Sequence, residues 1–167
     1  LEMKIFRRPF WKAETSKCYV IPMSVLFVLF LPYPIDFIYN SECYEFHPLV
    51  LLPIGMFALV FLFMPSQYFY VILAEDRLML RNGIYTFWKK ECLYQDIVKV
   101  KVGWAGGRSL PYMQVFTKQT KKRTWQYVID LVNPKSYNEL IEDIKAKGIP
   151  VETKRLECFT KYYKPGK

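Results

Sequence analysis

The sequence predicts an α+β membrane protein, in which a two-helix transmembrane hairpin precedes an antiparallel β-module that is closed by one amphipathic helix. The hairpin is predicted because residues 18–35 and 48–74 contain no charged residue. Both stretches approach or exceed the roughly 20 apolar residues that a helix needs to cross a bilayer. The module is predicted because apolar and polar residues alternate from about Tyr68 onward, a pattern typical of half-buried strands.

Charge is unevenly distributed along the 167 residues, whose net charge is +9. Residues 1–17 hold five Lys or Arg against two acidic residues, and residues 66–167 hold 19 against 10. Residues 36–47 hold three acidic residues and no Lys or Arg. Because segments rich in Lys and Arg stay on the cytoplasmic side, the sequence predicts a multi-pass protein of the bacterial cytoplasmic (inner) membrane, with cytoplasmic N- and C-termini.

The first uncharged stretch is interpreted as a retained anchor rather than a cleaved signal peptide. A signal peptide would need small residues before its cleavage site, and residues 31–36 offer none. Proline interrupts helical hydrogen bonding, and Pro32 lies near the outer end of this stretch. We therefore expect the first helix to run from about Tyr19 to Leu31 or slightly further.

Four segments follow from these patterns. They are a basic interfacial arm at 1–17, the hairpin at 18–65, the β-module at 66–148 and a basic tail at 149–167. Within the hairpin, helices at about 18–35 and 48–65 flank an outward acidic loop at 36–47. The tail is either partly disordered or packed on the module. Leu1 and Glu2 resemble a remnant of cloning, so the natural chain is expected to begin at Met3.

Six or so antiparallel strands are expected in the module, from residues 68–73, 77–81, 84–88, 98–102, 112–117 and 125–131. Asn82-Gly83 is a strong hairpin signal, since both residues tolerate positive φ. Val98, Val100 and Val102 are expected on one buried face.

A helix is expected to end the module. Asn133 can cap it and Pro134 suits its first turn. Spacings of three and four residues place one apolar stripe along it, formed by Tyr137, Leu140, Ile141 and Ile144. Gly148 is expected to terminate this helix.

Two runs of the module resemble bacterial pleckstrin-homology-like (PH-like) domains. Residues 70–83 are similar to their opening strand, polar turn, Arg-Leu pair and glycine turn, and residues 94–100 to a later Asp-Ile signature. Asn133-Pro134 at the start of the last helix also fits. Many members carry two membrane-spanning helices directly before the domain. The resemblance implies a PH-like antiparallel β-barrel or sandwich, made of two curved sheets and capped by the C-terminal helix.

The family's lipid-reading relatives use several Lys and Arg around the first hairpin loop. The corresponding loop here is the acidic run Ala74-Glu75-Asp76. The resemblance therefore does not extend to a conventional inositol-phosphate pocket.

Residues suited to catalysis are scarce, so we expect no enzyme, no catalytic residue and no cofactor. His47 is the single histidine, and no nucleophile-elbow, Walker or dinucleotide motif occurs. The four cysteines lack metal-ligand spacing and are expected to be free thiols. Asp36, Glu42 and Glu45 have oxygens that suit a hard cation, but a solvated acidic loop is favoured, so no metal site is predicted.

Basic and aromatic residues form the candidate binding surface. The residues expected to contact a membrane surface or a partner are Arg7, Arg8, Trp11, Lys12, Lys118, Lys121, Lys122 and Arg123. Each cation near an anionic leaflet contributes about 1 kcal/mol of attraction. Nucleic acid is not an expected partner, because Trp125 and Tyr127 share a face with Ile129 and are expected to fill the barrel.

The functional hypothesis is a non-enzymatic, membrane-anchored PH-like scaffold or accessory subunit. Its expected partners are the lipid bilayer, with anionic headgroups at the cytoplasmic leaflet, and a protein in a membrane complex. Homo-oligomerisation is left open. The alternative hypothesis is an immunity or inhibitor protein that neutralises a membrane-acting toxin.

Overall fold

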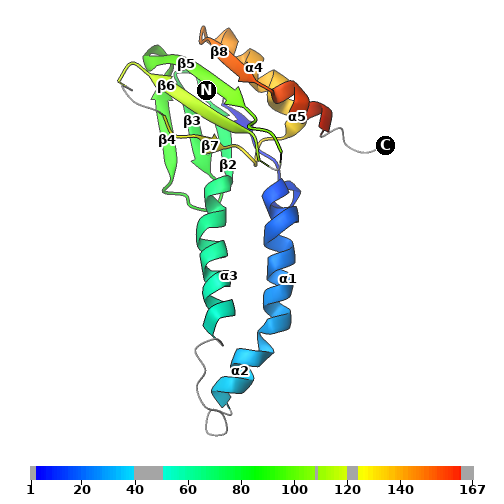
Figure 1. The fold of residues 1–167 in the computed structure, drawn as a ribbon. Coiled ribbons are helices and arrows are strands. Elements are labelled where there is room, and N and C mark those ends of the chain that lie inside the picture. The colour runs from blue at the N-terminus through cyan, green and yellow to red at the C-terminus, as the bar shows by residue number, and fades with distance from the viewer. Residues whose placement is uncertain (1–2, 40–50, 108, 120–123, 163–167) are drawn as a thin grey trace.

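A β-rich head and a pair of helices that projects from it make up the protein (Figure 1). The computed structural model describes residues 3–39, 51–107, 109–119 and 124–162. The head contains two four-stranded sheets. Helices α4 (Tyr137–Ala146) and α5 (Leu156–Tyr162) lie together beside strand β8 (Val151–Lys154) on one side of the head.

The first sheet is antiparallel throughout, with the order β1-β2-β3-β4. Its strands are β1 (Lys4–Phe6), β2 (Phe69–Leu73), β3 (Arg77–Asn82) and β4 (Lys89–Leu93). Strand β1 belongs to the segment that the sequence assigns to an interfacial arm. Phe6 lies opposite Val71 and is 5% exposed, because it packs into the core of the head. The arm is therefore part of the fold.

The second sheet has the order β7-β6-β5-β8. Its strands are β5 (Ile97–Gly103), β6 (Tyr112–Thr117), β7 (Tyr127–Val128) and β8 (Val151–Lys154). Strand β8 runs parallel to β5, and α5 follows it. Leu156 and Phe159 of α5 are buried in the same core as α4. The basic tail thus packs on the module through Leu156 and Phe159, which is one of the two outcomes that the sequence left open.

Helix α4 confirms the predicted amphipathic helix. The whole predicted stripe is buried, namely Tyr137, Leu140, Ile141 and Ile144. The side-chain oxygen of Asn133 accepts a hydrogen bond from the Lys135 backbone N–H at 3.1 Å, so the predicted cap is present at the 3-10 turn before α4. Gly148 follows the helix with φ of +80°, a conformation that glycine adopts at little cost.

The expected strand at 84–88 is wrong. Arg81 lies opposite Lys89, so the partner of β3 is β4, and residues 83–88 form a wide connection. The Asn82 side chain organises this connection, since its oxygen accepts hydrogen bonds from the backbone N–H groups of Ile84 and Tyr85. A side chain that bonds the backbone two and three residues ahead replaces the tight two-residue turn.

Two apolar side chains face outward against expectation. A register shift between Ile97 and Lys99 interrupts the alternation of β5, which leaves Val98 51% exposed while Val100 is buried. Trp125 is 62% exposed and lies before the short strand β7. The expected common face of 125–131 is therefore wrong at its first residue.

The projection consists of α1 (Ile21–Phe30), α2 (Pro32–Tyr39) and α3 (Leu51–Phe63). A π-helical turn, Ser16–Val20, connects the head to α1, and a 3-10 turn, Met64–Gln67, returns α3 to the head. A turn residue, Leu31, separates α1 from α2 where Pro32 begins the next helix. The uncharged stretches are thus divided into short helices.

Among the residues that the structure describes, no helix is both long and apolar enough to cross a bilayer. At 1.5 Å per residue, α1 is roughly 15 Å long and the described α3 roughly 20 Å, against a hydrocarbon core of about 30 Å. The predicted transmembrane hairpin is therefore wrong. The same finding contradicts the classification as a membrane protein and the localisation as a multi-pass protein of the bacterial inner membrane, because both rested on that hairpin.

Candidate functional site: the apolar projection and its polar base

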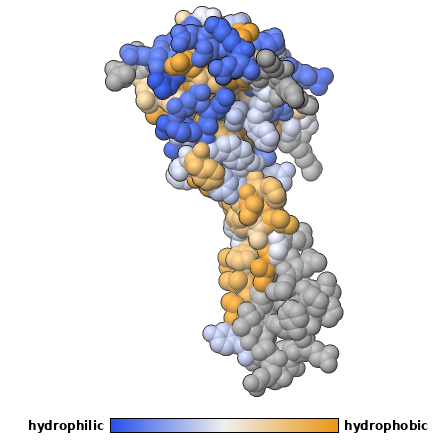
Figure 2. Space-filling view, turned by 90° about the vertical axis from the view of Figure 1, so that its left-hand side faces the viewer, coloured by the Kyte–Doolittle hydropathy of each residue, from blue (hydrophilic) through white to orange (hydrophobic). Residues whose placement is uncertain are grey.

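The projection exposes large apolar side chains on both of its arms. Val28, Leu29 and Phe30 of α1 are between 50% and 66% exposed, and Leu62 and Phe63 of α3 are 62% and 66% exposed. Figure 2 shows this apolar surface extending away from a largely hydrophilic head. An exposed apolar surface that continues along two helices marks an interaction site, because monomeric proteins rarely leave such surface in water.

The two arms contact one another through aromatic rings. Phe27 of α1 and Phe57 of α3 pack edge to face, with ring centroids 5.0 Å apart. Phe57 is 8% exposed, so this contact is the buried centre of the projection. The outer faces of both helices remain available to a partner.

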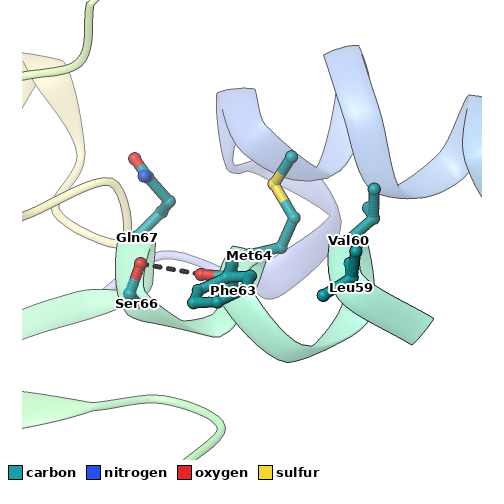
Figure 3. Close-up of a pocket in the computed structure, with 6 residues that line it drawn as sticks. All are labelled: Leu59, Val60, Phe63, Met64, Ser66 and Gln67. Atoms are coloured by element: carbon teal, nitrogen blue, oxygen red, sulfur yellow. Dashed lines mark hydrogen bonds between the residues drawn. The ribbon is translucent and has the colours of Figure 1, made fainter. Parts of the chain in front are cut away.

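A hollow of about 310 Å³ lies where α3 meets the head. It is lined by Leu59, Val60, Phe63, Met64, Ser66 and Gln67. Figure 3 shows these six side chains along the last turns of α3 and the following 3-10 turn, with the two polar residues at the end nearer the head. The Ser66 hydroxyl donates to the Phe63 carbonyl oxygen at 2.7 Å, so its hydrogen is already used within the turn.

Asp130 holds the base of α1. Helical backbone begins at Glu14, and the first N–H groups of a helix have no partner within it. The Asp130 carboxylate accepts the N–H of Glu14 at 3.1 Å and that of Thr15 at 2.8 Å. A carboxylate here also interacts favourably with the helix dipole. Asp130 therefore caps a helix that starts 116 residues earlier in the chain.

Arg8 completes this arrangement. Its guanidinium donates to the Asp130 carboxylate and to the Asp130 backbone carbonyl, both at 2.8 Å. Only 10% of the Arg8 side chain and 1% of the Asp130 side chain are exposed. We call Arg8, Asp130 and the two capped N–H groups the clasp. The clasp joins the N-terminal segment that contains β1, the loop after β7 and the start of the projection.

Tyr68 lies beside the clasp and contacts the side chain of Ser16, the residue after Thr15. Its hydroxyl and the Ser16 hydroxyl are 2.9 Å apart, and both residues are buried. Burial raises the pKa of Tyr68 to about 12, with a smaller contribution from the negative charge of Asp130 and an opposing one from Ser16. The neutral phenol is thus the form that the fold requires.

We expect stability to fall between pH 10 and about 12. The unfolded chain releases the Tyr68 proton near pH 10, whereas the folded chain holds it until about pH 12, so this contribution is complete below pH 10 and is lost as pH rises through 12. Circular dichroism at fixed urea across this range measures the loss. Tyr68→Phe should make the fall shallower without removing it, because burial also raises the pKa of Tyr94 to about 12. An unchanged profile in that variant would exclude Tyr68 as a contributor.

The base of α3 is held by polar contacts of its own. The Asn82 side-chain amide donates to the Pro65 carbonyl at 2.6 Å, and Asn82 is buried. The Tyr85 hydroxyl donates to the Leu62 carbonyl at 3.3 Å, which satisfies one of the unpaired carbonyl groups at the end of the helix. Both arms of the projection are therefore fixed to the head by side chains from distant parts of the sequence.

The residues predicted to bind a membrane surface or a partner differ in their exposure to solvent. Arg7, Trp11, Lys12 and Lys118 are exposed. Arg8 faces inward and is committed to Asp130, which removes it from the candidate surface. The other three predicted residues, Lys121, Lys122 and Arg123, lie outside the described residues.

Metal and thiol chemistry have little support in the described part of the chain. Its residues include no group of three His, Cys, Asp or Glu side chains that could hold a metal ion. Cys18, Cys92 and Cys158 are free, and burial raises the pKa of the Cys92 thiol. Cys43 and the predicted loop residues Glu42, Glu45 and His47 fall outside the described ranges.

Sequence reasoning did not identify the clasp, although one signal was present. Asp130 stands between Ile129 and Leu131 in an otherwise apolar run. A carboxylate is almost never fully buried unless it is paired, so such a residue indicates a partner elsewhere in the chain. Nothing in the sequence identifies that partner as Arg8.

No protein-family model, no curated protein and no solved structure matches this chain. The resemblance to bacterial PH-like domains therefore stays a prediction.

Proposed function

We propose that this chain is a non-enzymatic accessory subunit or scaffold that binds a protein partner through the projection, with a head of PH-like type. The observation that carries the proposal is the large apolar surface that both arms expose, for example at Val28, Leu29 and Leu62. Each such side chain gains about 1.5–3 kcal/mol when it is fully removed from water. Helices that expose apolar side chains along their outer faces favour a partner that covers those faces.

The polar base of the projection favours binding over a role in internal packing. Asp130 fixes the start of one arm and Asn82 the end of the other. Arms that are held in place lose little conformational freedom on association, so more of the apolar contact energy appears as affinity.

The chemistry of the surface indicates the kind of partner. The described part of α1 and α3 carries no charged side chain, so a partner with a matching apolar helix face would bury few charges. The hollow beside Phe63 and Met64 offers a recess for a side chain of that partner. The proposed partner is therefore a protein that presents one or more apolar helices.

Photo-crosslinking in cells tests the proposal. A photoreactive phenylalanine analogue at Val28 or Leu59, which are 66% and 58% exposed, should give a discrete protein adduct. Adding Leu29→Glu and Leu62→Glu should lower the adduct yield about tenfold or more, because each introduces an unpaired charge into an apolar contact. Adduct yield is measured by immunoblotting and the partner is identified by mass spectrometry.

Val98→Glu is the matched control, because it places the same charge at an exposed apolar position of the head. It should leave the adduct unchanged. If no protein adduct forms at either position, or if the two glutamates leave the yield unaltered, the projection is not the binding surface.

A further inference from the structure

One face of the first sheet points away from the core of the head. Val71 of β2 and Leu80 of β3 lie opposite each other and are buried in that core. Successive side chains of a strand point to opposite faces, so the neighbouring residues Tyr70 and Arg81, which also lie opposite each other, point outward. Lys89 of β4 lies opposite Arg81 and extends this outward row to the edge of the sheet.

Arg7 completes the row on the other side of Tyr70. It follows Phe6, which lies opposite Val71, and the carbon of its guanidinium is 5.0 Å from the centre of the Tyr70 ring. Such a cation–π contact holds the guanidinium over the ring. Three cations and one aromatic ring therefore lie in a single line across the four strands. We call Arg7, Tyr70, Arg81 and Lys89 the outer row.

Neither arginine of the outer row is hydrogen-bonded to a carboxylate of the described part of the chain. No such carboxylate lies within ion-pair distance of Arg7, which is exposed. Arg81, whose side chain is 43% exposed, is 3.8 Å from the Glu91 carboxylate, which is too far for a hydrogen bond. Glu91 is held more closely by Lys89, at 3.1 Å, and this contact is the main reason that its pKa is lowered. Arg7 and Arg81 therefore have N–H groups available to an acceptor outside the chain.

The outer row leaves its face of the sheet with a positive charge. Its three cations outnumber Glu91, the carboxylate that lies opposite Met79 at the next level of the same face. Arg77, on the same strand as Arg81, donates to Asp76 at 2.8 and 2.9 Å, so that pair adds no net charge. An acidic partner would therefore meet cations that the chain itself does not neutralise.

An apolar side chain lies beside the outer row. Ile5 precedes Arg7 by two residues, so it points to the same face, and it is 56% exposed. It lies opposite Ile72, which lies opposite Met79, and both of these residues are almost fully buried. Arginine, methionine and aromatic residues are enriched at the centres of protein interfaces, where lysine and glutamate are depleted. The composition of this face therefore favours a protein as its partner.

The outward face of the second sheet differs in composition. Lys101 of β5 stands between the buried residues Val100 and Val102, and it lies opposite Glu152 of β8. Lys154 follows two residues later on the same side of β8. Lysine and glutamate are typical of a solvated surface, so this face is the reference for the first.

We propose that the outer row binds an acidic segment of a partner protein. Carboxylates of that segment accept paired hydrogen bonds from the guanidinium groups of Arg7 and Arg81, and an apolar side chain of the segment covers Ile5. The Arg7 guanidinium is already held over the Tyr70 ring, so little of its conformational freedom is lost on binding. The same contact covers one face of that ring and keeps a nucleic-acid base from stacking there, so a protein is favoured over a nucleic acid.

Fluorescence anisotropy with the full chain tests the inference. The probe is a fluorescein-labelled peptide of alternating Glu and Leu, which offers carboxylates and apolar side chains together. It should bind the chain, and its affinity should fall as salt rises. Arg7→Glu with Arg81→Glu should weaken the binding about tenfold or more, and Ile5→Ser should weaken it severalfold.

A milder pair of substitutions guards against a loss of folding. Arg7→Lys with Arg81→Lys keeps both charges but removes the planar guanidinium groups, so its affinity should lie between those of the parent and of the glutamate variant. Circular dichroism shows whether each variant is folded. An affinity equal to that of the parent in both pairs would overturn the inference.

Lys101→Glu with Lys154→Glu is the matched control, because it makes the same change in net charge on the outward face of the other sheet. It should bind the peptide like the unmodified chain. Three outcomes would each overturn the inference: equal loss in this control, no binding of the peptide to the parent, or displacement of the peptide by single-stranded oligothymidylate at lower concentration than by unlabelled peptide.

The outer row belongs to the head and shares no residue with the projection, so this inference goes beyond the proposed function. Leu29→Glu with Leu62→Glu should therefore leave the affinity for the acidic peptide unchanged. The Arg7 and Arg81 variants should in turn retain the protein adduct at Val28. Peptide binding that is lost in the leucine variant and kept in the arginine variants would place the peptide on the projection and would overturn the inference.

Discussion

Replacing Asp130 by alanine is expected to lower the free energy of unfolding by about 3–5 kcal/mol, the range for breaking a buried ion pair by removal of one partner. The Arg8 guanidinium, whose side chain is only 10% exposed, would stay buried with the more distant Glu14 carboxylate, at 3.9 Å, as its remaining ion-pair partner. The N–H groups of Glu14 and Thr15 would lose their acceptors at the same time. Urea denaturation followed by circular dichroism measures the change.

Two further variants show whether the clasp causes the loss. Asp130→Asn keeps one oxygen as an acceptor but directs an amide nitrogen at a donor, so it should fall between the parent and the alanine variant. Asp76→Ala removes a carboxylate whose ion pair with Arg77 is exposed, and it should leave the midpoint nearly unchanged. If Asp130→Ala were no more destabilising than Asp76→Ala, the clasp would contribute nothing to the fold.

The clasp also determines where the projection points. Capped N–H groups at Glu14 and Thr15 fix the first turn of the helical backbone against the head. A variant that folds without this cap would keep the Ser16–Tyr68 hydroxyl contact and the Phe27–Phe57 ring contact, so we expect α1 to be held less tightly rather than released. Binding through the projection would then weaken even though its apolar surface is intact.

The elements that the sequence predicts well are those whose signal is local. The strand at 69–73 is a compact apolar run that is almost entirely buried, and the helix at 137–146 buries the face that its three- and four-residue spacing reveals. Asn133 and Gly148 carry their own end signals, one as a cap and one as a glycine in the left-handed region. These features need no knowledge of the rest of the chain.

The missed elements depend on distant partners. The three residues of β1 and the four of β8 are too short to show a period, and each is a strand only because β2 or β5 offers a free edge. In the sequence, Arg8 resembles the other basic residues of segment 1–17, and only the tertiary fold brings it into contact with Asp130. Side-chain pairs of this kind are fixed by the tertiary fold, so half of the candidate site was beyond sequence reasoning.

The hairpin prediction failed for a related reason. Counting uncharged residues treats residues 18–35 as one helix, but the structure divides them among a π-helical turn, α1 and the beginning of α2. The turn residue Leu31 ends the first α-helix directly before Pro32. Apolar composition identified the residues of the projection, whereas Pro32 marks the place where α1 gives way to α2.

Phe69→Ala is expected to cost about 3–5 kcal/mol of unfolding free energy, the range for removing a buried aromatic ring. Phe69 is fully buried and packs edge to face against Trp88 at 5.3 Å and Tyr127 at 5.0 Å. These rings come from the first sheet, from the connection before β4 and from β7 of the second sheet. The alanine variant should therefore loosen the contact between the sheets, and its denaturation midpoint in urea should fall with little change in the m-value.

Phe87→Ala is the matched control, because it removes the same side chain from a position that is 79% exposed. Its midpoint should stay within about 0.5 kcal/mol of the parent, the usual range for a surface substitution. Together the two variants separate the effect of burying an aromatic ring from that of merely carrying one on the surface. A Phe87→Ala chain as unstable as Phe69→Ala would mean that the exposed ring supports the fold, and a fully stable Phe69→Ala chain would mean that the two sheets are held together elsewhere.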